Sequence, residues 1–403
     1  MAQEKRILSP LPEIAAGLMP VAWTYLQKSH PPSDGNLMKP ADNSVLRAPA
    51  EQVHAEELSR LRDKDAGPRP TGWSLSPRGV RAFILGDDRL GVRRKFYGDD
   101  ALIDRCIVTL MSSRGLLLVG EPGTAKSMLS ELLSTAVSGQ STCVIQGTAG
   151  TTEDQIKYSW NYALLLAEGP SQRALVRGPI YEAMQRGRLC RFEEVTRVQP
   201  EIQDCLISLL SDKVLHVPEL DGDAATVFAA PGFNVLATAN IRDRGVHEMS
   251  SALKRRFNFE TVRPINDRKL EIQLVRDQTD ALLRHAHVDV ELATDVVDLL
   301  VTAFQDLRNG VTAEGVVVEK PTAGMSSAEA VAVGYAAALD AHYFGNGEVG
   351  GEHIARQLIG TVLKDNPDDG KKLRHYFDVV VKQRAQRQPQ WKRVLESRKE
   401  LER

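Results

Sequence analysis

The segment RGLLLVGEPGTAKS, residues 114–127, joins a short apolar run to a glycine-containing turn and a Lys-Ser pair. An apolar run bounded by glycine predicts a buried strand, and the stretch that follows, KSMLSELLSTAVSG, has the pattern of a helix. GEPGTAKS (120–127) matches the arrangement G-x-x-x-x-G-K-[ST], except that Ala125 replaces the last glycine. Backbone N–H groups at such a helix N-terminus cradle phosphate. The segment therefore predicts a phosphate-binding loop, called here the phosphate loop.

Two side chains of this loop have distinct expected roles. Lys126 would reach the β- and γ-phosphate oxygens of a nucleotide, and the Ser127 hydroxyl would coordinate Mg²⁺. Alanine at position 125 is tolerated if that residue keeps a negative φ, which is the expectation here. The residues predicted to bind the nucleotide are Gly120, Glu121, Pro122, Gly123, Thr124, Ala125, Lys126, Ser127 and Met128.

Short apolar runs and amphipathic stretches alternate after the phosphate loop. The runs TCVIQ, LCRF and FNVLATA predict strands, whereas PIYEAMQRG and QPEIQDCLISLLSDK predict helices. This alternation is typical of an α/β fold, a parallel sheet with helices on both faces.

The chain divides into four expected regions. Residues 1–79 form a Pro-rich N-terminal extension, since nine of the twenty prolines fall within residues 1–70, with one short helix around AEQVHAEELSRLRDK. Residues 80–264 form the α/β domain. Residues 265–370 form a helical domain, in which Leu292, Val296, Leu299, Ala303 and Leu307 share one helix face. Residues 371–403 form a basic helical tail with eleven Lys/Arg against four Asp/Glu.

Composition limits the class of protein. A net charge of −2 and an ordinary apolar content of 42% argue against a bulk nucleic-acid or membrane-surface binder. The four cysteines have no metal-ligand spacing and are expected to be reduced thiols. The N-terminus lacks the apolar run of a secretion signal, and no apolar run is long enough to span a membrane. We expect a soluble, cytoplasmic protein.

Polar residues follow two of the later strands. LCRFEEV (189–195) ends in the adjacent acids Glu193 and Glu194, and FNVLATAN delivers Asn240 to the end of its strand. Glu193 is expected on the magnesium side and Glu194 as the base that activates water. Asn240 would orient that water. Arginines at the end of a following helix, LKRRF (253–257), would stabilise the transferred charge on a neighbouring subunit's nucleotide.

This combination is the signature of an AAA+ ring ATPase, and residues from about 96 to 264 resemble the MoxR branch of that group, with a looser match of the lid to about residue 365. The resemblance rests on VIQGT, RGPIYEAMQRGRLCRFEEVTR and GVHEMSSALKRRF. It implies an AAA+ fold with a helical lid, ATP and Mg²⁺ as cofactors, and an arginine finger at Arg256 beside Arg255, which replaces an aspartate. It also implies that Arg197 faces the subunit interface.

Three departures mark a variant subgroup with a Glu-Glu acidic strand. Glu193 replaces the family's aspartate, Thr196 replaces an asparagine, and Gly324 in PTAGM (321–325) stands where the family's lid carries an arginine. Arg191 is expected on the same side of its strand as Glu193, paired with an acid or facing the subunit interface. Because Lys126, Glu194 and Asn240 are all present, we expect slow but genuine ATP hydrolysis.

The resemblance implies a hexameric ring that remodels or activates a client protein, in the manner of a chaperone, with a von Willebrand A domain protein as a partner. Residues 150–178 and 218–232 would face the client. An alternative is an ATP-gated assembly module with little turnover, in a defence or signalling complex. A nucleic-acid motor is a third alternative, supported only by the basic tail and opposed by the near-neutral net charge.

Overall fold

The computed structural model describes residues 47–240, 245–364 and 366–402. Of the expected Pro-rich extension, residues 1–46 lie outside this range. The described residues of that extension form α1 (Ala50–Val53) and α2 (Ala55–Lys64), so that the single helix expected there is two helices meeting at His54. Leu58 and Leu61 of α2 are buried in the same apolar core as the helices of the α/β domain.

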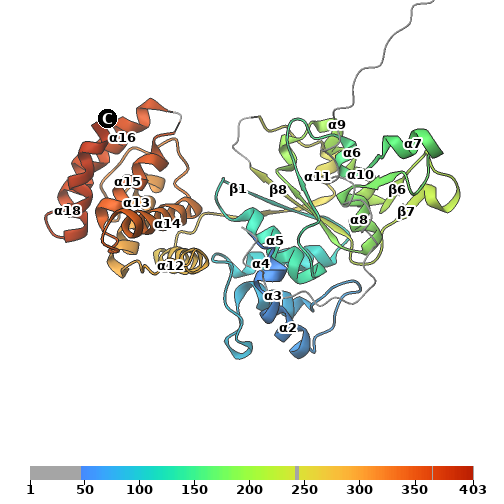
Figure 1. The fold of residues 1–403 in the computed structure, drawn as a ribbon, viewed down its shortest axis with the longest axis horizontal. Helices are drawn as coiled ribbons and strands as arrows, with labels where there is room; N and C mark the ends of the chain where they lie inside the picture. Colours follow the sequence, from blue (N-terminus) through green and yellow to red (C-terminus); the bar gives the residue numbers. More distant parts are fainter. Residues whose placement is uncertain (1–46, 241–244, 365, 403) are drawn as a thin grey trace, which may run out of the picture. The chain divides into compact units, whose positions relative to one another are not determined.

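A five-stranded parallel sheet forms the centre of the α/β domain (Figure 1). Its strand order is β2-β5-β8-β1-β9. The strands are β1 (Gly115–Gly120), β2 (Val144–Gln146), β5 (Leu189–Glu193), β8 (Asn234–Asn240) and β9 (Phe257–Thr261). Gly120 at the end of β1 pairs with Asn240 at the end of β8, and Gln146 of β2 pairs with Glu193 of β5. The register therefore gathers the phosphate loop, Asn240 and the acidic pair at one edge of the sheet.

The apolar runs form strands because both of their faces are covered. Every residue of β1, β5 and β8 is buried. Along β1, Leu116 and Leu118 pack into one core, and Leu117 and Val119 pack into the core on the opposite face. Burial of each such leucine contributes roughly 1.5–3 kcal/mol relative to exposure. The expected α/β sheet with helices on both faces is confirmed.

Separate sets of helices supply the two cores. The first core takes side chains from α3 (Pro77–Leu85), α4 (Asp100–Met111) and α5 (Lys126–Ser138). The second takes side chains from α8 (Pro179–Arg186), α10 (Leu206–Ser211) and α11 (Ser251–Lys254). A short helix, α9 (Pro200–Gln203), precedes α10, so the single helix expected over 199–213 is interrupted at Asp204 and Cys205.

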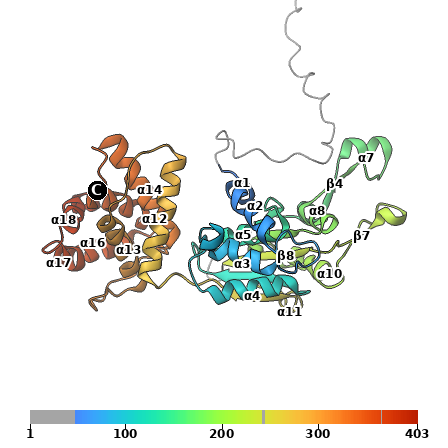
Figure 2. The same cartoon turned by 90° about the horizontal axis from the view of Figure 1, so that it is seen from below.

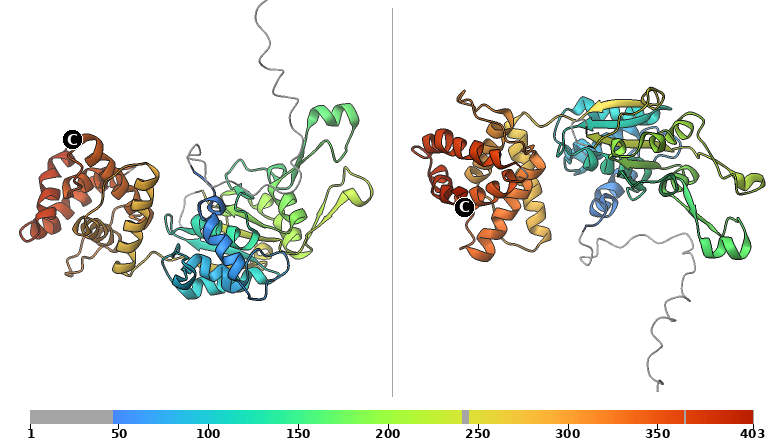
Figure 3. Two further views of the ribbon diagram at one scale, coloured as in Figure 1. Left: turned by 60° about the horizontal axis from the view of Figure 1, so that its bottom comes forward. Right: turned by 90° about the horizontal axis from the view of Figure 1, so that it is seen from above.

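Two hairpins extend away from the sheet (Figures 2 and 3). One consists of β3 (Tyr158–Trp160) and β4 (Leu175–Arg177), with α6 (Glu153–Ile156) before it and α7 (Tyr162–Glu168) at its tip. The other pairs β6 (Val214–His216) with β7 (Thr226–Phe228). They correspond to the two segments that were expected to face a client.

The C-terminal third of the chain is a helical domain with one apolar core. Its longer helices are α12 (Arg268–His285), α13 (Thr294–Asn309), α14 (Ser327–Phe344), α15 (Gly351–Val362), α16 (Pro367–Tyr376) and α18 (Pro389–Glu396). A wide helical turn, Phe377–Val381, and α17 (Lys382–Arg384) join the last two. All five residues of the predicted apolar face are buried, as expected: Leu292, Val296, Leu299, Ala303 and Leu307.

Residues of the basic tail belong to this same core. Leu373, Phe377 and Trp391 are buried against it, and Arg384 is nine-tenths buried in an ion pair with Asp306 at 2.6 Å. The positive charge of the tail is therefore carried partly by side chains that hold the domain together. No helix within the described part of the chain is long and apolar enough to cross a membrane.

Candidate functional site

The phosphate loop wraps around the side chain of Lys126. Lys126 is the first residue of α5, and only 6% of it is exposed. Its Nζ donates to the carbonyl oxygens of Gly120 at 3.2 Å and Glu121 at 2.7 Å, while Thr124 Oγ1 donates to the Glu121 carbonyl at 2.9 Å. These bonds hold the ammonium group in the hollow of the loop, where a phosphate group would meet it.

Ala125 has a φ of 65°, in the left-handed region, and not the negative φ expected from the sequence. The position therefore has a backbone conformation that suits glycine better than alanine. A left-handed conformation costs a residue with a Cβ atom roughly 1–2 kcal/mol. The loop geometry is retained because α5 and β1 fix both of its ends, so the strain is borne at this residue.

We expect Ala125→Val to lower the free energy of unfolding by about 1–3 kcal/mol, because a β-branched residue fits the left-handed region worse than alanine does. Ala125→Gly is the matched control and should change it by less than about 1 kcal/mol, since the lost strain and the gained chain entropy oppose each other. Urea unfolding of both variants measures the difference. Equal stability of the two variants would contradict the left-handed conformation.

A cavity of about 210 Å³ lies beside the loop. Six of the nine predicted nucleotide-binding residues line it: Glu121, Pro122, Gly123, Thr124, Ala125 and Met128. Gly324 also lines it, at the position where the resemblance puts a lid arginine. Gly120, Lys126 and Ser127 are outside the lining, since Gly120 and Lys126 are buried beneath the loop and Ser127 lies one residue into α5.

The far end of this cavity is apolar, and sequence reasoning missed it. Phe96, Tyr97, Ile265, Leu274 and Val331 line that end. A mostly apolar slot beside a phosphate-binding loop suits the flat base of a nucleotide. The signal available in the sequence was the aromatic pair Phe96-Tyr97, but nothing local to it indicated that it would meet residues 265–331.

Tyr97 is fixed by a hydrogen bond. Its hydroxyl donates to Asp277 Oδ2 at 2.6 Å. Burial and the neighbouring carboxylate raise the pKa of Tyr97, so that the phenol stays protonated and remains a donor. The aromatic wall of the cavity is thereby tied to α12.

The acidic strand β5 contains a buried ion pair. Arg191 and Glu193 are 8% and 4% exposed, and Arg191 Nη2 lies 2.9 Å from Glu193 Oε1. Glu193 Oε1 also accepts from Ser130 and from Arg191 Nε, and Oε2 accepts from Thr238 Oγ1 at 2.8 Å. Both carboxylate oxygens are thus bonded to protein donors. The expectation that Arg191 lies on the same side as Glu193 and pairs with an acid is confirmed.

These bonds decide the charge of Glu193. Burial acts to raise the pKa of its carboxyl, but the hydrogen bond from Ser130, the Arg191 guanidinium and the hydroxyls of Thr238 and Ser127 outweigh it and hold that pKa below its usual value. Glu193 is therefore an anion with a fixed counter-ion next to the phosphate loop.

Glu194 and Asn240 meet at the ends of neighbouring strands. Asn240 Nδ2 donates to Glu194 Oε1 at 2.7 Å, and Glu194 N donates to Thr238 Oγ1 at 3.0 Å. Glu194 has a φ of 56°, an uncommon conformation for a residue with a side chain, which turns the chain sharply at the end of β5. Arg197 Nε lies 3.6 Å from Glu194 Oε2 and its side chain is 46% exposed. The structure thus brings three predicted site residues together.

Arg255 and Arg256 follow α11, and neither of them lines the cavity. Arg256 Nε donates to Ser211 Oγ at 2.6 Å and Nη1 donates to the Ala252 carbonyl at 2.6 Å, whereas Arg255 is exposed. Neither of the two predicted finger residues is therefore part of the cavity beside the chain's own phosphate loop.

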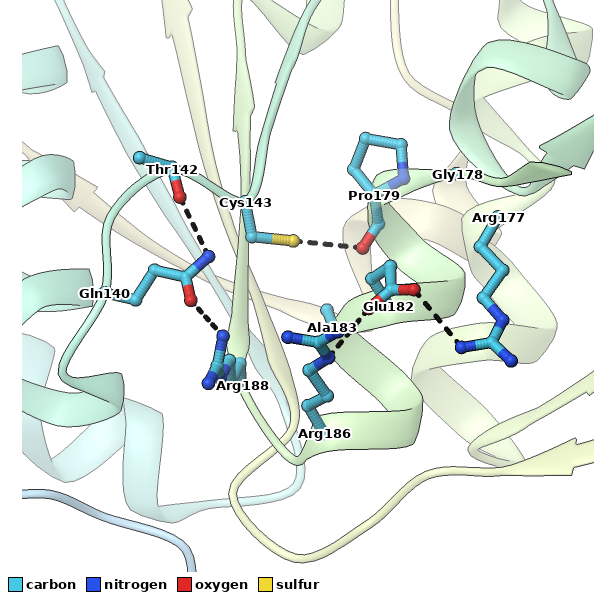
Figure 4. Close-up of a pocket in the computed structure, with 10 residues that line it drawn as sticks. All are labelled: Gln140, Thr142, Cys143, Arg177, Gly178, Pro179, Glu182, Ala183, Arg186 and Arg188. Carbon is cyan, nitrogen blue, oxygen red and sulfur yellow. Dashed lines mark hydrogen bonds and ion pairs between the residues drawn. The ribbon is translucent and has the colours of Figure 1, made fainter. Parts of the chain in front are cut away.

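A second cavity, of about 270 Å³, opens beside α8 and has three arginines in its lining (Figure 4). Arg177 and Arg186 both pair with Glu182, at 3.5 Å and 2.8 Å, and Arg188 donates to the Gln140 amide oxygen. Cys143 donates to the Pro179 carbonyl at 3.0 Å, and all four cysteines of the chain are free thiols. The lining of this cavity contains no residue of the phosphate loop, so the first cavity is the candidate nucleotide site.

Comparison with protein families finds two matching models. Residues 115–257 match the AAA domain of the dynein-related subfamily, and residues 269–402 match the C-terminal domain of YehL-like AAA+ ATPases. The first match runs from the start of β1 to the first residue of β9 and therefore contains the phosphate loop, the acidic strand and Asn240. The second spans the helical domain together with the basic tail.

The chain is also similar to individual proteins and solved structures. The uncharacterized protein YehL of Escherichia coli K12 is 47% identical over 365 residues, which cover 90% of this chain and 100% of YehL. An uncharacterized protein of Staphylococcus haemolyticus is 27% identical over 162 residues, 40% of this chain and 59% of that protein. Among solved structures, NtrX from Brucella abortus with ADP has a TM-score of 0.45 at 11% identity, covering 75% of this chain and 64% of NtrX. A RuvB mutant from Thermotoga maritima has a TM-score of 0.43 at 11% identity, covering 72% of this chain and 78% of RuvB.

Proposed function

This chain belongs to the YehL family of AAA+ ATPases, and we propose that it binds ATP with Mg²⁺ and couples slow hydrolysis to the remodelling or activation of a partner protein. The working form is a ring of identical subunits, with six as the expected number. The MoxR resemblance of the sequence supports the chaperone-like role and a von Willebrand A domain protein as a partner.

The observation that carries the proposal is the hydrogen bond between Asn240 and Glu194 beside the phosphate loop. Glu194 has the charge and position to take a proton from the attacking water, and Asn240 holds the carboxylate in place. Lys126 stabilises the negative charge on the transferred phosphoryl group. Bound Mg²⁺ would add further stabilisation of phosphate charge, with the Ser127 hydroxyl as its protein ligand.

The two hairpins supply exposed apolar side chains for a client. Tyr162 and Leu166 of α7 are 71% and 89% exposed, and Phe228 of β7 is 72% exposed. Large exposed apolar residues at the tips of projecting elements are typical of protein contact sites. They support a client of polypeptide nature.

Two measurements on one preparation test the proposal: steady-state ATP turnover, and mass in solution with and without ATP. A remodelling ATPase turns over ATP, and Glu194→Gln lowers this turnover by about 10²–10⁴-fold while assembly persists. The second candidate, an ATP-gated assembly module, is favoured by Gly324 at the expected arginine position in the cavity lining. It would assemble with ATP while the parent shows no turnover above background.

If Arg256 acts as an arginine finger on the nucleotide of the neighbouring subunit, its loss should lower turnover without preventing ATP binding. Arg256→Ala should lower turnover about 10³-fold while ATP binding is kept, and Arg255→Ala should have a smaller effect because Arg255 has no equivalent anchor to Ser211. Lys126→Ala should also be inactive, because it lacks the phosphate contact.

Equal mixtures of Arg256→Ala and Lys126→Ala subunits should then recover about a quarter of the parent's turnover, because one interface in four pairs an intact Lys126 with an intact Arg256. Turnover that stays at zero in the mixture, although mixed rings form, would contradict a finger acting between subunits.

A further inference from the structure

The guanidinium of Arg191 is fixed by bonds from all three of its nitrogen atoms. Nε donates to Ser130 Oγ at 3.0 Å and to Glu193 Oε1 at 3.2 Å. Nη1 donates to the Ser141 carbonyl at 3.1 Å, and Nη2 donates to the Ser127 carbonyl at 3.2 Å and to Glu193 Oε1 at 2.9 Å. A planar fork held in this way keeps its charge in one place.

That place is directly behind the phosphate loop. Ser127 follows Lys126 in the first turn of α5, and its carbonyl is one of the acceptors of Arg191. The same residue carries the hydroxyl that is expected to bind Mg²⁺. Arg191, Glu193 and Ser127 therefore form one connected group.

Within this group, Ser127 fits a magnesium ion and Glu193 does not fit as a direct ligand. Glu193 Oε1 accepts from Ser130 and Arg191, and Oε2 accepts from Thr238. Direct coordination would require this buried carboxylate to give up protein bonds, whereas Mg²⁺ readily keeps water molecules between itself and a carboxylate.

The pair also changes the charge that a nucleotide meets. A buried carboxylate without a counter-ion beside the phosphate loop would repel the nucleotide phosphates, and a divalent cation would be needed to offset it. Arg191 supplies that offset permanently. By thermodynamic linkage, Mg²⁺ then increases the affinity for the nucleotide by a smaller factor, because the nucleotide is not repelled when Mg²⁺ is absent.

We propose that Arg191 is a built-in cation of the nucleotide site, which neutralises Glu193 and makes nucleotide binding only weakly dependent on Mg²⁺. The inference rests on the proposed function, since it concerns the same site. It assigns Arg191 a positioning and electrostatic role, and it makes Glu193 the fixed partner of Arg191 in place of a direct metal ligand.

Calorimetric titration of ADP into the full chain, with Mg²⁺ and again with EDTA, tests the inference. The ratio of the two dissociation constants should stay within about threefold for the parent, and it should rise to roughly tenfold or more for the double variant Arg191→Leu/Glu193→Asp, which leaves an uncompensated acid. Arg186→Leu, which removes an arginine of α8 paired with Glu182, is the control and should behave as the parent. Equal ratios in the parent and the double variant would overturn the inference.

A second variant keeps the test valid if the double variant does not fold. Glu193→Gln retains the shape of the side chain and leaves Arg191 as a net positive charge, so ADP should bind more tightly than to the parent in EDTA and no more weakly in Mg²⁺. Weaker binding confined to Mg²⁺ would show a direct metal ligand and overturn the inference. Absence of ADP binding to the folded parent under both conditions would overturn the proposed function as well.

Discussion

Replacing Glu194 by glutamine should lower the steady-state rate of ATP hydrolysis by about 10²–10⁴-fold, the usual contribution of a general base. Glutamine has the shape of glutamate and can still accept from Asn240 through its amide oxygen, so the 2.7 Å contact can survive. The lost property is the ability to take a proton from water. ATP affinity should therefore change little, since Lys126 and the loop backbone remain.

A coupled assay for released phosphate and a titration of ATP binding together measure this result. Glu396→Gln is a suitable control, because Glu396 is an exposed residue of α18, far along the chain from the phosphate loop. Loss of turnover with equal loss of ATP binding would indicate a structural role for Glu194. Unchanged turnover would remove it from the mechanism.

Arg191→Leu should lower the free energy of unfolding by about 3–5 kcal/mol at neutral pH, because it leaves the carboxylate of Glu193 buried without its counter-ion. The double variant Arg191→Leu/Glu193→Leu should recover much of this loss, since two apolar side chains of similar size replace a buried ion pair at little cost. Urea unfolding of the parent, both single variants and the double variant gives the coupling energy of the pair.

The pH dependence of these variants has a definite sign. In the parent, the pKa of Glu193 is lowered on folding, so the stability it contributes is present above the unfolded-state value of 4.5 and is lost as the pH falls through the lower folded-state pKa. In Arg191→Leu the counter-ion is gone, burial dominates and the pKa should rise. The difference in the free energy of unfolding between the parent and Arg191→Leu should therefore become smaller as the pH is lowered from 8 toward 5. A deficit independent of pH would show that packing, and not charge, accounts for it.

The sequence was sufficient to predict the sheet and the edge that carries the chemistry. β1, β5 and β8 are continuous apolar runs, because strands covered on both faces can contain little else. The strand β9 (FNFET) was not predicted, because it lies at the sheet edge, where buried and exposed residues are mixed and Phe259 is 46% exposed. Its pattern was too short to distinguish it from a loop.

Within the site, sequence motifs placed residues better than they described conformations. Lys126, Glu194 and Asn240 could be predicted because each follows or ends a strand of the same sheet. The left-handed φ of Ala125 could not be predicted, because the sequence shows that a glycine is replaced but does not show which backbone conformation the loop adopts. The apolar end of the cavity depends on residues such as Phe96 and Val331, which are distant in the sequence and meet only through tertiary packing.

The fork that Arg191 makes with Glu193 also limits how this site can evolve. A lineage that acquired Arg191 before Glu193 would bury a cation without a partner. A lineage that lost Arg191 first would leave the carboxylate of Glu193 buried without a partner. Either single change leaves one buried charge without its partner, so we expect Arg191 and Glu193 to change together among relatives.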